Sequence, residues 1–89
     1  MSKSNNCPLI KGFKLDVSLA FGIAIRKLRR ARDLTQKGLG FEAGLRRTFI
    51  SSLELVQKQP SIATIQKLAD TFGISMAELM ELTENELPK

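Results

Sequence analysis

Two adjacent arginines open a predicted short helix at residues 46–55, within the stretch GLRRTFISSLE of residues 44–54. The amino terminus of a helix carries a partial positive charge, so cations destabilise it and Ser or Asp would be favoured there. Arg46 and Arg47 stand at this end instead. A guanidinium group donates hydrogen bonds in a fixed fork that suits anionic and planar acceptors. The pair therefore indicates a binding partner that offsets the local penalty.

The distribution of charge also favours an anionic partner. The 89-residue chain has 14 Lys and Arg against 9 Asp and Glu, a net charge of +5. Residues 1–58 contain twelve basic and four acidic residues, a net charge of +8, whereas residues 59–89 contain two and five, a net charge of −3. A basic part joined to an acidic part is typical of a chain that binds a polyanion through one face. On charge alone, a basic surface that is simply solvated remains an alternative.

The composition excludes several kinds of chemistry. The chain has no His, which removes imidazole general-base catalysis and the commonest metal ligand. Its single cysteine, Cys7, cannot close an internal disulfide and is far short of a zinc site. The sequence shows neither a buried-carboxylate pattern nor a phosphate-binding glycine loop. We therefore expect a protein that is not an enzyme and that uses no metal and no cofactor.

Neither a membrane span nor a signal peptide is predicted. No run is long and apolar enough to cross a bilayer, and the first residues, MSKSNN, lack the apolar core of a signal peptide. A small domain without disulfides suits a reducing compartment. We expect a cytoplasmic protein with no membrane partner.

The sequence predicts an all-α fold of five helices, and these helices must position the two arginines. Residues 1–16 are expected to form an amino-terminal arm, residues 17–83 the folded domain, and residues 84–89 an acidic tail. The helices are predicted at residues 17–32, 35–43, 46–55, 61–72 and from residue 75 to about residue 82. Thr35, Ser61 and Ser75 are placed as amino-terminal caps, the last in an S-x-x-E capping box, and Gly44 and Gly73 as stops.

Apolar spacing predicts one small core. Seven residues are assigned to it, six on the inward faces of these helices and Leu45 in the turn after the second helix: Leu39, Ala43, Leu45, Ile50, Leu53, Leu68 and Leu79. Gly38 and Gly40 each cost the second helix about 1 kcal/mol relative to Ala. They indicate either a weak helix or a place where another helix comes close. The second and third helices are separated by only Gly44 and Leu45, which is the spacing of a helix-turn-helix at about residues 35–54.

The motif TQKGLGFEAGLRRTFISSLE of residues 35–54 resembles the Cro/repressor-type, XRE-like helix-turn-helix family. The likeness begins at FGIAIRKLR, residues 21–29, and continues through PS, LADTF and GIS at residues 60–61, 68–72 and 73–75. It covers about residues 19–82. The resemblance implies a five-helix, lambda-repressor-like DNA-binding domain. Members are bacterial and phage regulators that commonly act as homodimers.

The resemblance also implies roles for individual residues at the double-stranded DNA interface. Arg47, Thr48 and Ser52 correspond to base-reading positions in the major groove, with Arg46 at the rim. Gln36 corresponds to a phosphate ligand at the start of the second helix, and Lys37, Ser51 and Lys58 are further phosphate candidates. Arg29 and Glu54 correspond to a structural salt bridge.

The sequence departs from the family pattern at the ends of the third helix. Arg46 stands where Ser or Thr usually caps it, and Leu55-Val56 replaces a usual Asn-Gly or Arg-Gly pair.

At the carboxyl end of the chain, the resemblance implies a dimer interface formed by Phe72, Ile74, Met76, Leu79, Met80 and Leu82. The alternative is that these residues complete the core of one chain.

We therefore expect a sequence-specific transcriptional regulator that binds a palindromic operator as a homodimer, without a small-molecule effector. A restriction–modification controller or a small prophage repressor would fit the size of the chain. The alternative is a protein-interaction adaptor or an antitoxin on the same fold. Two arginines on the reading face favour DNA, whereas an acidic or apolar face would favour a protein partner.

Overall fold

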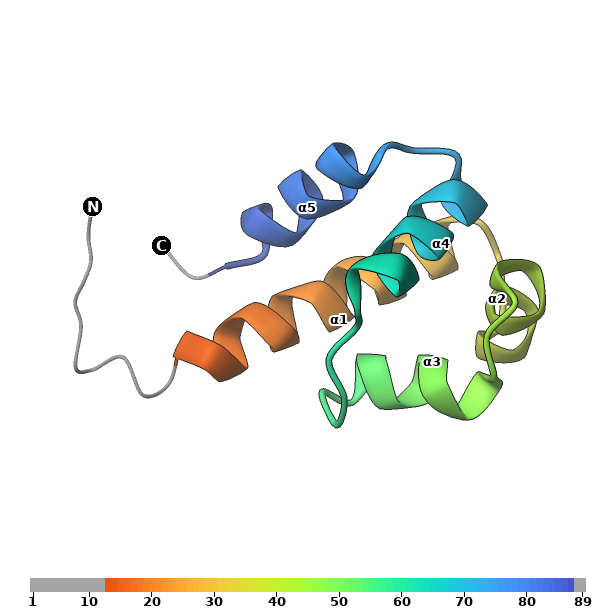
Figure 1. The fold of residues 1–89 in the computed structure, drawn as a ribbon, viewed down its shortest axis with the longest axis horizontal. Helices are drawn as coiled ribbons and strands as arrows, with labels where there is room; N and C mark the ends of the chain where they lie inside the picture. Colours follow the sequence, from red (N-terminus) through yellow and green to blue (C-terminus); the bar gives the residue numbers. More distant parts are fainter. Residues whose placement is uncertain (1–12, 88–89) are drawn as a thin grey trace.

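The long first helix, α1 (Phe13–Ala31), packs mainly against the third and fifth helices in the computed structural model, which describes residues 13–87. It is followed by α2 (Gln36–Ala43), α3 (Arg47–Glu54), α4 (Ile62–Phe72) and α5 (Met76–Asn85). Figure 1 shows α5 along one side of α1 and α3 on the other side. All secondary structure in the described range is helical, which confirms the predicted all-α, five-helix fold.

The ends of the folded region differ from the sequence prediction. Helix α1 begins at Phe13 and not at Val17, so residues 13–16 are helical where an arm was predicted. Residues 13–16, FKLD, contain neither Pro nor Gly, so their sequence is compatible with a helix. The rest of the predicted arm, residues 1–12, lies outside the described residues.

At the other end, α5 runs to Asn85, into the predicted acidic tail of residues 84–89. The carboxylate of Glu86 lies 2.6 Å from Nζ of Lys27 on α1. The beginning of the tail is therefore attached to the domain through an ion pair between α1 and the end of α5. Residues 88–89 lie outside the described range.

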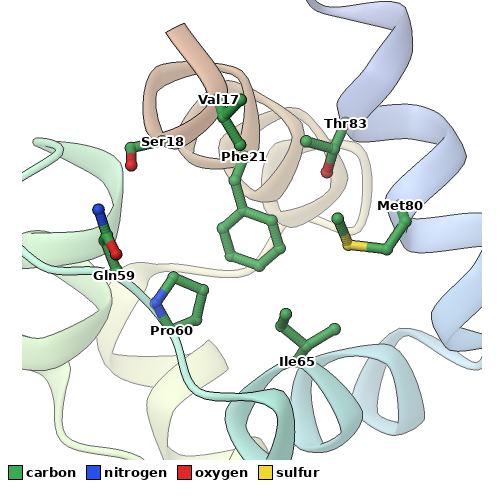
Figure 2. Close-up of a pocket in the computed structure, with 8 residues that line it drawn as sticks. All are labelled: Val17, Ser18, Phe21, Gln59, Pro60, Ile65, Met80 and Thr83. Carbon is green, nitrogen blue, oxygen red and sulfur yellow. The ribbon is translucent and has the colours of Figure 1, made fainter. Parts of the chain in front are cut away.

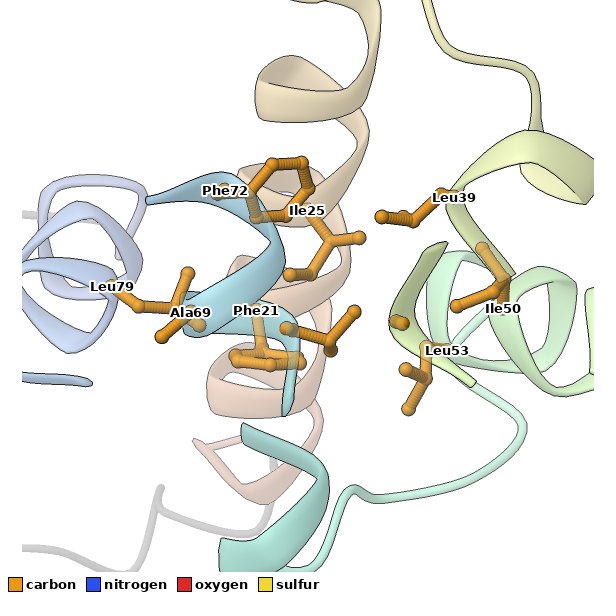
Figure 3. Close-up of a cluster of buried hydrophobic side chains, with 10 residues drawn as sticks. Phe21, Ile25, Leu39, Ile50, Leu53, Ala69, Phe72 and Leu79 are labelled. Atoms are coloured by element: carbon orange, nitrogen blue, oxygen red, sulfur yellow. The ribbon is translucent and has the colours of Figure 1, made fainter. Parts of the chain in front are cut away.

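The core lies between α1 and the other four helices (Figure 3). Six of the seven residues that were assigned to it are buried, and Leu45 is partly buried against it. Alpha-helical spacing brings one or more large side chains from each helix into this cluster, which contains Phe21, Ile25, Leu39, Ile50, Leu53, Leu68, Phe72 and Leu79.

Local capping explains where α2, α4 and α5 begin and where α2 and α4 end. Thr35 accepts a hydrogen bond from the backbone N–H of Gly38 over 2.9 Å, and Ser61 accepts one from Thr64 over 3.1 Å. Ser75 and Glu78 form the predicted capping box of α5. Gly44 and Gly73 end α2 and α4 with φ of 71° and 72°, in the left-handed region that Gly adopts without strain. These predicted caps are confirmed.

Candidate nucleic-acid interface

The turn between α2 and α3 fixes where the third helix points. The backbone N–H of Gly44 donates to carbonyl oxygens of Gly40 and Phe41, and the N–H of Leu45 donates to Gly40 over 2.7 Å. Arg46 then occupies the N-cap position of α3 in an extended conformation. Its side chain makes no capping hydrogen bond, which confirms that this helix lacks its normal cap. The turn leaves α3 at the surface of the molecule (Figure 1).

Helix α3 has one apolar face and one polar face. Ile50 and Leu53 are buried, whereas Arg46, Arg47 and Thr48 are exposed at its amino-terminal end. The hydroxyl of Ser52 donates to the backbone carbonyl of Thr48 over 2.9 Å, so its oxygen keeps acceptor capacity toward solvent.

A hollow of about 500 Å³ lies beside this polar face. Its lining joins α3 to the loop after it and to the first turn of α4, and consists of Gly44, Leu45, Arg46, Thr48, Phe49, Ser52, Lys58 and Thr64. Lys58, a predicted phosphate ligand, therefore shares one site with three of the predicted base-reading residues. The sequence prediction did not include Thr64 in this site. The only signal for Thr64 in the sequence was its position in the first turn of a predicted helix.

The other predicted phosphate ligands are less uniform in their surroundings. Lys37 is exposed in the first turn of α2, and Ser51 is half-buried on α3. Gln36, the first residue of α2, is half-buried, and its Nε2 donates to Oε1 of Glu54 over 3.2 Å. The structure thus gives Gln36 a protein partner that the sequence did not predict.

The predicted salt bridge between Arg29 and Glu54 is present and ties α1 to the end of α3. Nε of Arg29 donates to Oε2 of Glu54 over 2.7 Å, and Nη2 donates to Oε1 over 3.0 Å. The two side chains are only 11% and 4% exposed. The hydrogen bond with Glu54 raises the pKa of Arg29 above its usual value, although burial acts in the opposite direction. Nη1 of Arg29 also donates to the carbonyl of Leu34 over 2.9 Å, which holds the segment before α2.

A second arginine of α1 holds α4 in place. Nη2 of Arg32 donates to the carbonyl oxygen of Phe72 over 2.7 Å, and its guanidinium carbon lies 5.1 Å from the centroid of the Phe72 ring. The positive charge therefore meets the carbonyl end of α4, where the helix dipole favours it. The sequence prediction did not identify this contact.

Two of the six residues predicted for a dimer interface belong to the core of the single chain. Phe72 is 3% exposed and Leu79 is 0% exposed, so neither side chain is available to a partner. The apolar period of α4 and α5 directs both toward α1 and the other helices. Ile74 and Met76 are partly buried against the same core.

The remaining two, Met80 and Leu82, are 39% and 37% exposed and line apolar hollows on either flank of α5. The larger hollow, of about 400 Å³, is drawn in Figure 2, where Met80 and Ile65 lie across from Phe21. It is lined by Val17, Ser18, Phe21, Gln59, Pro60, Ile65, Met80 and Thr83, none of which is charged. Leu82 lines the smaller hollow, of about 220 Å³, against α1.

None of the helices in residues 13–87 has the length and apolar composition needed to cross a bilayer.

Comparison with known proteins agrees with this geometry. A family model described as helix-turn-helix matches residues 25–79. Control protein C.MunI of Mycoplasma sp is 32% identical over 72 residues, which cover 80% of this chain and 97% of that protein. Control protein C.BamHI of Bacillus amyloliquefaciens is 30% identical over 69 residues, which cover 76% of this chain and 85% of that protein.

A solved structure shares both sequence and fold. The restriction-modification controller protein C.AhdI from Aeromonas hydrophila is 37% identical, with a TM-score of 0.67 over 70% of this chain and 94% of that chain. The family match spans the turn and the exposed face of α3 described above. The chain therefore belongs to the helix-turn-helix family.

Proposed function

We propose that this chain is a transcriptional regulator that binds a palindromic DNA operator as a homodimer. The observation that carries the proposal is the exposed amino-terminal end of α3. Arg46, Arg47 and Thr48 are exposed there, and Arg46 and Thr48 line one hollow with Lys58, whereas Arg47 lies outside its lining. This end of a helix-turn-helix recognition helix is the part that meets base edges in the major groove.

The polar face of α3 has the donors and acceptors that base recognition requires. Arg47 presents a fork that matches O6 and N7 of guanine, and Thr48 offers a hydroxyl for a base edge or a methyl group for thymine. Ser52 lies one turn further along the same face, with its oxygen free to accept. Arg46 at the rim reaches a base or a phosphate.

Contacts with phosphates would fix the register of the protein on the duplex. Gln36 and Lys37 at the start of α2, Ser51 on α3 and Lys58 after it are the proposed ligands. The free N–H groups at the start of α2 favour an anion at the same place. These contacts give affinity without sequence information, and they make binding weaker as salt rises.

Dimerisation supplies the remaining specificity. A single small domain contacts too few base pairs to select one site in a genome. We propose that Met80 and Leu82, with the partly buried Ile74 and Met76, form the interface between two copies. Two recognition helices about 34 Å apart would then read an inverted repeat.

Among regulators, a restriction–modification controller is the role that we favour over a prophage repressor. The relatives named control proteins match this chain along 97% and 85% of their own lengths, so the likeness extends over most of each relative. The cationic reading face argues against an adaptor or antitoxin whose main partner is a protein.

Selection of bound sites from random duplexes tests the proposal directly. We expect enrichment of one inverted repeat, and an affinity for it whose logarithm falls linearly with the logarithm of salt concentration. A protein that selects no sequence, or whose affinity is indifferent to salt, would contradict the proposal. Sedimentation equilibrium with and without the selected duplex measures the dimer.

A further inference from the structure

We infer that Gln36 is a positioning residue that joins a DNA phosphate to Glu54 and thereby fixes the orientation of α3. The inference rests on the proposed function and deepens it. A phosphate ligand alone adds affinity for every sequence, whereas this arrangement makes the phosphate contact contribute to base discrimination.

The inference starts from the surroundings of the Glu54 carboxylate. Its side chain is 4% exposed and accepts three hydrogen bonds from side chains, two from Arg29 and one from Gln36. Arg29 comes from α1, Gln36 is the first residue of α2, and Glu54 is the last residue of α3. One carboxylate thus joins the three helices that set the position of the reading face.

The chemistry of the amide determines what else Gln36 can bind. Only its nitrogen can donate to the carboxylate, because the amide oxygen would face Glu54 as a second acceptor and repel it. The NH₂ group has two hydrogens, and the contact with Oε1 of Glu54 at 3.2 Å uses one of them. The second hydrogen remains for a phosphate oxygen. A bound phosphate and Glu54 would then lie on the two hydrogens of one nitrogen.

This arrangement orders the amide before DNA arrives. A side chain already held by a buried partner loses less rotamer freedom when it binds a second group. The hydrogen bond between Gln36 and Glu54 also resists displacement of the start of α2 relative to the end of α3. Such a displacement would break a hydrogen bond to a buried charge. The phosphate contact therefore favours one angle of α3 in the groove, and a shift of that angle would move Arg47 and Thr48 relative to the bases.

A neutral donor suits this position better than a cation. Lys or Arg at residue 36 would compete with Arg29 for the same carboxylate, and Glu would place two carboxylates together and repel phosphate. Gln satisfies Glu54 without altering the charge balance of the Arg29–Glu54 pair.

The test compares Gln36→Ala with Lys37→Ala in the 89-residue chain. Lys37 is the adjacent residue, is exposed and is a proposed phosphate ligand, so its substitution is the matched control. Dissociation constants are measured for the selected operator and for a duplex of scrambled sequence at one salt concentration, and thermal unfolding checks that both variants fold.

We expect Lys37→Ala to weaken binding to both duplexes by the same factor. Gln36→Ala should lower the ratio of operator to scrambled affinity roughly tenfold or more, about the effect of one hydrogen bond to a charged group. An equal loss on both duplexes for Gln36→Ala would overturn the inference and leave Gln36 as a phosphate ligand alone. A wild-type protein that does not distinguish the two duplexes would overturn the proposed function itself.

A double-substitution cycle gives a second readout. If Gln36 acts through Glu54, the effect of Gln36→Ala on the affinity ratio should largely disappear in a Glu54→Gln background. Full additivity of the two effects would contradict the coupling. The comparison with Lys37→Ala stands by itself if Glu54→Gln does not fold.

Discussion

The backbone of Gly40 lies directly against Leu45, so that a Cβ at residue 40 would stand 2.6 Å from the carbonyl oxygen of Leu45. The N–H of Leu45 in turn donates to the carbonyl oxygen of Gly40. These contacts bring the middle of α2 against the turn and the start of α3. Gly40 is therefore required for the close approach of two backbones, and its effect is not merely to weaken a helix.

Gly40→Ala should destabilise the protein by about 1–3 kcal/mol, because the added methyl group must displace backbone atoms of the turn. Gly38→Ala is the matched control, since its nearest neighbour is a side-chain oxygen of Thr35 at 3.2 Å. Urea unfolding of the two variants compares the costs. Equal free energies of unfolding would show that the approach at Gly40 does not constrain the turn.

The sequence predicted those parts of the fold that depend on local interactions. Thr35, Ser61 and Ser75 each cap a helix through a backbone N–H three residues further on, so a short window of sequence contains the whole interaction. The bidentate pair of Arg29 and Glu54 spans 25 residues and was predicted through family resemblance, not through spacing.

Interactions that depend on the path of the chain were missed. The contact of Gln36 with Glu54 and that of Arg32 with the carbonyl of Phe72 join residues 18 and 40 positions apart. Apolar periodicity likewise identified Leu79 as inward-facing but did not determine whether its own chain or a partner covers it. The structure assigns it to the core of one chain.

Val56 follows Leu55, the C-cap residue of α3, and has φ of 61°, a conformation that β-branched residues rarely adopt. The N–H of Gln57 donates to the carbonyl of Ser52 over 2.8 Å, which is the pattern of a helix end that usually has Gly at this position. Val56→Gly should therefore stabilise the protein by about 1 kcal/mol.

Asp33 has φ of 55° after α1, but Asp tolerates this region better. Asp33→Gly should give a smaller gain in the same unfolding experiment, and a gain as large as that of Val56→Gly would contradict the assignment of strain.

Met80 and Leu79 are adjacent on α5 but should affect different equilibria. Met80→Glu places a charge in the proposed interface and should raise the dimer dissociation constant about tenfold or more, with little effect on the folding of one chain. Met80→Leu, the control, should keep the dimer.

Leu79→Ala should lower the free energy of unfolding by about 2–5 kcal/mol because it leaves a cavity in the core. Sedimentation equilibrium and urea unfolding separate the two effects. A Met80→Glu dimer as tight as wild type would exclude this part of α5 from the interface.

Arg47 on α3 and Lys58 in the loop after it are both exposed, but they are expected to contact different parts of DNA. Arg47→Ala should lose about 1–3 kcal/mol of operator binding and relax the preference at one base position. Lys58→Ala should weaken all duplexes similarly and reduce the magnitude of the salt slope by about one. Binding titrations against a set of single-base operator variants, each at several salt concentrations, measure both effects. The assignment fails if Lys58→Ala alters base preference while Arg47→Ala does not.

Arg46 occupies the N-cap position of α3 without capping it, and its positive charge lies at the end where the helix dipole disfavours it. Arg46→Ser should supply the missing acceptor for a backbone N–H and raise the free energy of unfolding by about 1 kcal/mol. The same change removes a cation from the proposed DNA surface, so operator affinity should fall. Arg46→Ala is the control, because it removes the cation without adding a cap and should give the same loss of affinity with a smaller gain in stability. Thermal unfolding and operator titration of the three proteins measure both quantities. If the Arg46→Ser variant is more stable and binds as tightly as wild type, Arg46 has no role at the DNA surface.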